Sequence, residues 1–145
     1  MIAKVILGML ALAAVVPAST PIAEGRWIIT NQMEEVLFDG QRDDSPFPRS
    51  KPVSVCLAAA DAAKGPGLAF SDLSRCKVLK SNVSDGAFAF ETECKATESE
   101  DTILTKAAGR FSAGSYTGTS TSVQRRDGVQ IEMRSQVEAK HVSTC

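Results

Sequence analysis

Apolar and polar residues alternate with a period of two along most of the chain from Arg26 onward. Short runs rich in Val, Ile, Thr and Phe are separated by turn dipeptides at fairly even intervals, which is typical of antiparallel strands. Helical spacing is confined to residues 58–64, an Ala-rich stretch closed by Gly65 and Pro66, and this predicts a two-turn helix with a glycine stop. We therefore expect an all-β fold: an antiparallel meander of about seven strands with one short helix, forming a curved sheet or a small barrel.

The first predicted hairpin covers residues 77–94, where Asp85-Gly86 fits a two-residue type I′ turn. This turn places Lys80 opposite Glu91 as a favourable charge pair and gathers most bulky apolar side chains on the other face.

A three-residue loop is the alternative for this hairpin, and it would place Cys76 opposite Cys94. That register would turn Leu79 and Val83 to the opposite face from Phe88, which breaks the apolar pattern. The pattern therefore favours the two-residue turn.

Two more hairpins are predicted, with turns at Ala113-Gly114 and Asp127-Gly128. Their registers agree, because both leave one apolar face and one polar face. The apolar face reads Phe111, Tyr116, Ile131, Met133 and Val137. The polar face reads Arg110, Thr117, Thr119, Thr121, Glu132, Arg134, Gln136 and Glu138.

Upstream, residues 26–35 and 52–57 predict two further strands, joined by a surface loop at residues 39–51. The loop contains Asp39, Asp43 and Asp44, which are candidate calcium ligands. They lack the regular oxygen-ligand spacing of a known calcium motif, so a solvated loop is the favoured interpretation.

The first residues predict an export signal: Lys4, then an apolar run over residues 5–16, then Pro17 and Ala18. The run is shorter than the roughly 20 residues that cross a bilayer, so no membrane span is expected. Small residues at the third-last and last positions favour cleavage after Ala18, and cleavage after Ala23 is the alternative. We expect a signal peptide at residues 1–18 and a single mainly β domain at 19–145, in a periplasmic or secreted protein.

The charge balance of the 145 residues is near zero, with 16 Lys plus Arg against 17 Asp plus Glu. No basic block is present, so a nucleic-acid partner is not expected. The single His and the four Cys leave few groups that activate nucleophiles or bind metals. The sequence therefore predicts no catalytic residue, no metal and no cofactor.

The four cysteines of an exported chain predict two disulfide bonds. Strand parity places Cys94 and Cys145 on the same interior face, which leaves Cys56 to pair with Cys76. A four-cysteine zinc site is disfavoured, because such sites need close pairs and these spacings are 20, 18 and 51 residues. We expect the pairs Cys56–Cys76 and Cys94–Cys145.

Small residues stand on the apolar face of the last hairpins: Gly109, Gly118, Ser120 and Ser122. They leave space for a small apolar ligand, or else the short helix or a sharply curved strand packs there, which is the favoured interpretation. Trp27 similarly is a candidate for stacking on a ligand, although a core position on the first strand is favoured.

The order of several short motifs resembles the exported bacterial family called domain of unknown function 3617. The motifs are Gly25-Arg26-Trp27, Val55-Cys56-Leu57 with Asp61-Ala62-Ala63, Cys76-Lys77-Val78, Glu93-Cys94, Ser115-Tyr116-Thr117-Gly118-Thr119 and the terminal Cys145. The chain departs from the family pattern at Ile28 and Ser143, and it keeps only Met33 and Met133 after the leader, which argues against a thioether metal site. The resemblance implies an exported, mainly β protein and no particular reaction.

These observations predict an exported protein that acts as a binding or envelope-interaction module, with a small apolar ligand or an envelope component as partner. The alternative is a small periplasmic hydrolase, in which His141 would be the general base beside an acidic group and a hydroxyl.

Overall fold

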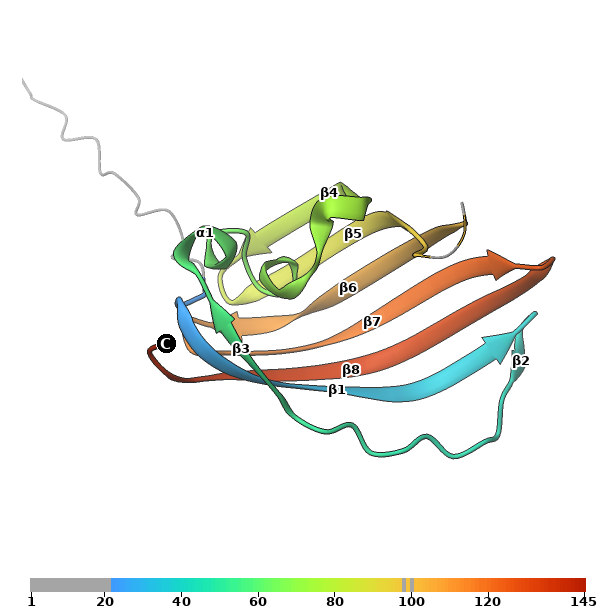
Figure 1. The fold of residues 1–145 in the computed structure, drawn as a ribbon, viewed down its shortest axis with the longest axis horizontal. Coiled ribbons are helices and arrows are strands. Elements are labelled where there is room, and N and C mark those ends of the chain that lie inside the picture. Colours follow the sequence, from blue (N-terminus) through green and yellow to red (C-terminus); the bar gives the residue numbers. More distant parts are fainter. Residues whose placement is uncertain (1–21, 98, 100) are drawn as a thin grey trace, which may run out of the picture.

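One antiparallel sheet holds most of the chain in the computed structural model, which describes residues 22–97, 99 and 101–145 (Figure 1). The predicted leader at residues 1–18 lies outside the described residues. The strands are β1 (Gly25–Phe38), β2 (Gln41–Arg42), β3 (Val53–Leu57), β4 (Cys76–Ser84), β5 (Ala87–Lys95), β6 (Thr102–Ser112), β7 (Ser115–Arg126) and β8 (Val129–Ser143). No helix of the described residues is long and apolar enough to cross a membrane.

The strand order is β2-β1-β8-β7-β6-β5-β4, with β3 pairing beside β2 on the same edge of β1. The predicted all-β meander is confirmed for β4 to β8, and the sheet is the curved, open form and not the barrel (Figure 1). The pairing of β1 with β8 joins the two ends of the described chain, and local sequence patterns carry no signal for it.

The two edges of this sheet are protected in different ways. The free edge of β1 is covered by β3, by β2 and by the connection between them, in which Ser50 donates its main-chain N–H to Gln32 at 3.0 Å and its hydroxyl to the carbonyl of Asn31. Pro46, Pro48 and Pro52 keep this connection from continuing the sheet. The β4 edge carries Lys77 and Lys80 instead, which discourage further strand pairing.

The predicted two-turn helix is shorter than expected. Only Ala59–Ala62 forms an α-helical turn, α1, and no side chain caps its first residue. Gly65 takes a positive φ of 90° before Pro66, which ends the helix. Two 3-10 helices follow, Leu68–Phe70 and Leu73–Arg75, and they lead into β4.

The register of the first hairpin combines the two predicted possibilities. Near the turn it is the two-residue form, with Val83 opposite Phe88 and Lys80 opposite Glu91, and the predicted charge pair is present at 3.9 Å. A β-bulge at Leu79 then shifts the pairing by one residue. From there to the end of the hairpin the pairing is that of the rejected register.

This bulge is why the predicted disulfide pairing is wrong. Strand parity assumed a regular β4, but the extra residue brings Cys76 directly opposite Cys94, with 4.0 Å between their Cα atoms, and the two are bonded. The other disulfide is Cys56–Cys145. Cys56 and Cys145 meet because Arg26 of β1 pairs with Cys56 on one side and with Ser143 on the other. All four cysteines are therefore oxidised, and none is available as a zinc ligand.

The later hairpins have the predicted registers. Phe111 lies opposite Tyr116, and Gly109 lies opposite Gly118. Burial alternates along β6 as predicted, with every second residue exposed. The apolar face of the sheet is its concave face, and the helical segment of residues 59–75 covers one end of it (Figure 1).

Candidate functional site

The side chains of the concave face form rows that run across the strands. Each row consists of residues that lie opposite one another on neighbouring strands. The first is Phe111, Tyr116, Ala139 and Ile29; the second is Phe88, Gly109, Gly118, Val137 and Asn31; the third is Phe90, Ala107, Ser120, Ser135 and Met33; the fourth is Thr92, Thr105, Ser122, Met133 and Val36; the fifth is Cys94, Ile103, Gln124, Ile131 and Phe38. The first two rows lie at the covered end, and the last row lies at the open end of the face.

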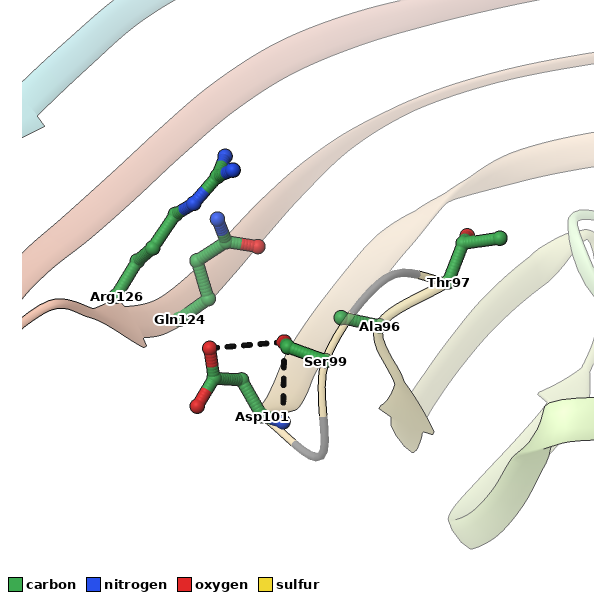
Figure 2. Close-up of a pocket in the computed structure, with 6 residues that line it drawn as sticks. All are labelled: Ala96, Thr97, Ser99, Asp101, Gln124 and Arg126. Carbon is green, nitrogen blue, oxygen red and sulfur yellow. Dashed lines mark hydrogen bonds between the residues drawn. The ribbon is translucent and has the colours of Figure 1, made fainter.

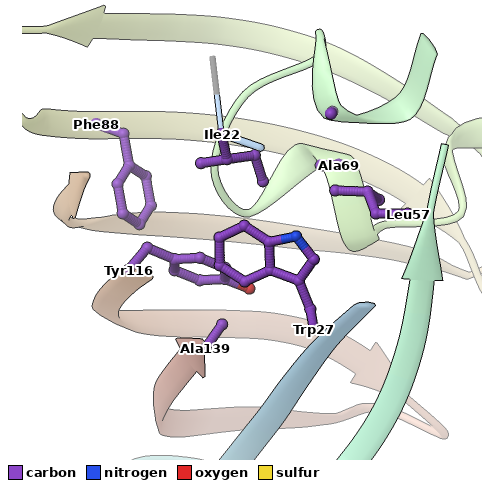
Figure 3. Close-up of a cluster of buried hydrophobic side chains, with 8 residues drawn as sticks. Ile22, Trp27, Leu57, Ala69, Phe88, Tyr116 and Ala139 are labelled. Carbon is purple, nitrogen blue, oxygen red and sulfur yellow. The ribbon is translucent and has the colours of Figure 1, made fainter. Parts of the chain in front are cut away.

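An aromatic cluster closes the covered end (Figure 3). Trp27 is fully buried, and its ring lies 5.6 Å from that of Phe70 and 6.3 Å from that of Tyr116. Phe88 meets Tyr116 edge-on at 5.9 Å between ring centres. The indole N–H of Trp27 donates to the carbonyl of Ala23 at 2.8 Å, so its one polar atom is satisfied. Trp27 is thus the core residue that the sequence favours, and its ring is not open to a ligand.

Gly109 and Gly118 are small because the protein itself occupies the space above them. A Cβ at Gly109 would lie 2.0 Å from the carbonyl oxygen of Thr117 and 2.9 Å from the ring of Phe88, and one at Gly118 would lie 3.0 Å from the same ring. These two positions therefore serve close packing of the curved strands. The ligand interpretation does not apply to them.

Ser120 is different, because it lies in an open groove of about 440 Å³ on the concave face. The floor comes from the sheet, and one wall comes from the segment between Gly67 and Leu73. Phe70 and Phe90 line its apolar part. A groove of this size, apolar with a few polar groups, is typical of a site for a small molecule.

A belt of hydroxyl groups crosses the concave face at the groove, where Thr105 and Ser120 line the groove and Ser122 and Ser135 are their partners. Thr105 and Ser122 are hydrogen-bonded at 2.8 Å, and Ser120 and Ser135 are hydrogen-bonded at 2.8 Å. The belt lies in the third and fourth rows, directly beyond the aromatic end. Ser120 and Ser122 were candidates from sequence, whereas Thr105 and Ser135 follow only once the registers are known.

Asp72 lies on the wall of the groove and is the residue there that sequence patterns missed. It caps the second 3-10 helix, where its carboxylate accepts from the main-chain N–H of Ser74 at 3.0 Å. Hydrogen bonds from the side chain and main chain of Ser74 hold the pKa of Asp72 below its usual range, so it is ionised at neutral pH. The Asp-x-Ser spacing of such a cap is visible in the sequence, but nothing there places it beside the sheet.

His141 takes a structural role at the rim of the covered end. Its Nε2 is 3.0 Å from the carbonyl oxygen of Glu24, and its ring meets Trp27 edge-on at 5.6 Å. A Cβ at Gly25 would lie 2.5 Å from the same Nε2, so that glycine makes room for the ring. These contacts do not place His141 in the groove.

The acidic loop that sequence analysis considered for calcium is held by main-chain groups. Asp39 accepts from the N–H of Gln130 at 2.9 Å, and Asp43 accepts from the N–H of Ser45 at 2.9 Å. Bonds from Ser45 lower the pKa of Asp43. Within the described part of the chain, no group of three or more His, Cys, Asp or Glu side chains is arranged to hold a metal ion.

Two other hollows are less suited to a ligand. One, of about 330 Å³, lies between Ser99 and Asp101 and the end of β7 at Gln124 and Arg126 (Figure 2). Its polar side chains come partly from a loop whose positions 98 and 100 lie outside the described residues. The other, of about 460 Å³, lies on the convex face, where Glu91 is paired with Lys80 and Lys106.

Comparisons with known proteins identify a family and no function. A family model described as "Protein of unknown function (DUF3617)" matches residues 22–145. Neither a search of curated proteins nor a search of solved structures found a match. The matched range begins at Ile22, which is also where the described structure begins.

Proposed function

The chain belongs to the DUF3617 family, and on this premise we propose that it is an exported binding module that holds a small amphipathic molecule in the groove on its concave face. The observation that carries the proposal is the groove itself. It runs from the aromatic cluster to the hydroxyl belt, with the segment from Gly67 to Leu73 as its wall. Beside the groove, both hydrogen bonding and a disulfide tie β4 to β5.

Export is supported by the leader pattern and by two disulfide bonds, which persist in oxidising compartments. Ile22 and Ala23 also favour cleavage after Ala18 over cleavage after Ala23. Ile22 is 2% exposed, and Ala23 donates to the carbonyl of Ala113 at 2.8 Å, so a later cut would remove part of the core. N-terminal sequencing of the protein from the periplasm of a bacterial host is expected to begin at Ser19; a start at Glu24 would contradict this.

The binding proposal is tested with a matched pair of variants on β6. Ala107 lies on the floor of the groove, whereas Ala108 points to the convex face and is exposed. Ala107→Phe fills the groove with a ring and Ala108→Phe does not. The probe is N-phenyl-1-naphthylamine, an apolar dye whose fluorescence rises when it leaves water.

We expect the wild-type protein to bind the dye, Ala107→Phe to bind it at least about tenfold more weakly, a loss of about 1.4 kcal/mol, and Ala108→Phe to bind it like the wild type. Thermal unfolding of both variants checks that the fold is kept. Absence of dye binding by the wild type, or equal weakening in both variants, would overturn the proposal.

A further inference from the structure

Resting on the proposed function, we infer that the groove selects uncharged amphiphiles over anionic ones. The apolar chain of the ligand packs at the aromatic end, and its uncharged polar head, with hydroxyl or ester groups, lies on the hydroxyl belt. The order of the rows gives this direction, because the apolar rows lie under the helical segment and the hydroxyl rows lie beyond it.

The hydroxyl belt has hydrogen-bonding capacity left over. A hydroxyl has one donor and two acceptor positions, and in each pair only one hydroxyl donates to the other. The pairs Thr105–Ser122 and Ser120–Ser135 therefore each keep one free donor, together with several free acceptor positions. A head group that both donates and accepts matches this belt, whereas a carboxylate or sulfate only accepts.

The charged residues around the groove also favour an uncharged head group. Asp72 is the only charged side chain among the described residues that line it, and no Lys or Arg is among them. Arg75 is close to Asp72 in sequence, but its guanidinium is bonded to the carbonyl oxygens of Lys95 and Ala96. An anionic head on the belt would thus lose water and face the Asp72 carboxylate, with no Lys or Arg among the described lining residues to pair with it.

Asp72 is placed to act on the head group and not on the chain. The wall runs from Gly67, where a Cβ would touch the ring of Phe90, to Cys76, which is opposite Cys94 in the fifth row. The disulfide sulfur of Cys76 lies 3.3 Å from the carbonyl oxygen of Asp72. Asp72 therefore lies beside the rows that contain the hydroxyl belt and the open end.

The test compares 1-decanoylglycerol with decanoate, which share one acyl chain and differ in head-group charge. Titration calorimetry on the full mature chain, below the micelle concentration of each, measures both affinities. We expect 1-decanoylglycerol to bind at least about fivefold more tightly, the size of effect that one nearby carboxylate exerts through partly hydrated surroundings.

Three variants separate the contributions. Asp72→Asn is expected to strengthen decanoate binding about threefold and leave 1-decanoylglycerol unchanged. Asp44→Asn removes an exposed carboxylate of the loop between β2 and β3 that does not line the groove, and it should change neither affinity. Ser120→Ala should weaken 1-decanoylglycerol about threefold and leave the apolar dye unaffected.

The outcomes distinguish this inference from the proposed function. If neither amphiphile nor the dye binds, the proposed function fails and the inference fails with it. If both amphiphiles bind equally and Ala107→Phe weakens both, the groove is a binding site and the selectivity is wrong. If the affinity for 1-decanoylglycerol exceeds that for decanoate by the same factor in Asp72→Asn as in the wild type, then Asp72 does not cause the selectivity and its proposed role is wrong.

Discussion

The two ends of the concave face share the same strands and differ in what covers them. At the covered end the helical segment and the residues before β1 lie on the sheet, and Trp27, Phe88, Tyr116 and Ala139 are all 5% exposed or less. At the open end the strands continue with no helical cover, and Phe38 is 43% exposed. The core of this protein therefore occupies only part of one sheet face, which leaves the groove between the two ends.

Removal of the disulfides should give the largest losses of stability, and the loss should differ between the two ends. Cys56–Cys145 ties the covered end across 89 residues, and Cys76–Cys94 ties the open end across 18. Loop-closure entropy predicts that Cys56→Ala with Cys145→Ala lowers the free energy of unfolding by about 4.6 kcal/mol, and that Cys76→Ala with Cys94→Ala lowers it by about 3.2 kcal/mol. Urea unfolding followed by circular dichroism measures both. A larger loss at the open end would contradict the comparison.

Trp27→Ala should show how much the covered core contributes to the free energy of unfolding. Trp27 has no exposed surface, and removal of a buried Trp or Phe side chain costs about 3 to 5 kcal/mol. The matched change at the open end is Phe38→Ala, for which we expect a loss of less than about 1 kcal/mol because the ring is already half hydrated. Chemical unfolding of both variants by circular dichroism gives the values. Equal losses would mean that Phe38 is buried in solution.

Gly109→Ala tests the close approach of strands at the covered end. The added Cβ would lie 2.0 Å from the carbonyl oxygen of Thr117 and 2.6 Å from the Cα of Gly118, so the backbone of β7 must move. We expect a loss of about 2 to 3 kcal/mol in the free energy of unfolding. Gly114→Ala is the control, because the nearest atom there, the Cβ of His141, is 4.0 Å away. An unchanged stability in Gly109→Ala would show that the strands are less tightly packed.

Ionisation of Tyr116 has the smallest expected effect on the free energy of unfolding. It makes the covered end sensitive to alkaline pH. Burial raises the pKa of this phenol to about 12, from an ordinary value near 10. Its folded-state pKa is the higher one, so its contribution is complete below pH 10 and is lost as the pH rises from about 10 to about 12. At pH 11 the ionisation of Tyr116 therefore lowers the free energy of unfolding by about 1.4 kcal/mol.

The chain has one Tyr, so ultraviolet absorbance of tyrosinate follows Tyr116 alone. We expect ionisation near pH 12 in the folded protein and near pH 10 in urea. Tyr116→Phe should remove this part of the alkaline loss in unfolding experiments. Ionisation of the folded protein near pH 10 would place Tyr116 in water and contradict a closed covered end.

Much of the fold was predictable from the sequence because its signals are local. Alternation of apolar and polar residues identified the strands, and the Asp-Gly and Ala-Gly turns set the later registers, including Gly109 opposite Gly118. The candidate site was predictable only in part. Ser120 and Ser122 were found from their face, but Asp72 and the wall were not, because they reach the sheet through a loop with no periodic pattern.

Local patterns were thus enough to predict an all-β chain with disulfide bonds and the faces of most of its strands, since period and turn chemistry depend on adjacent residues. Tertiary structure alone decided the bulge at Leu79, the pairing of β1 with β8 and hence both disulfides. It also decided that Phe88 fills the space above the glycines while Ser120 stays open. These outcomes depend on packing between residues far apart in the chain, where a shift of one position reverses the face of every later side chain.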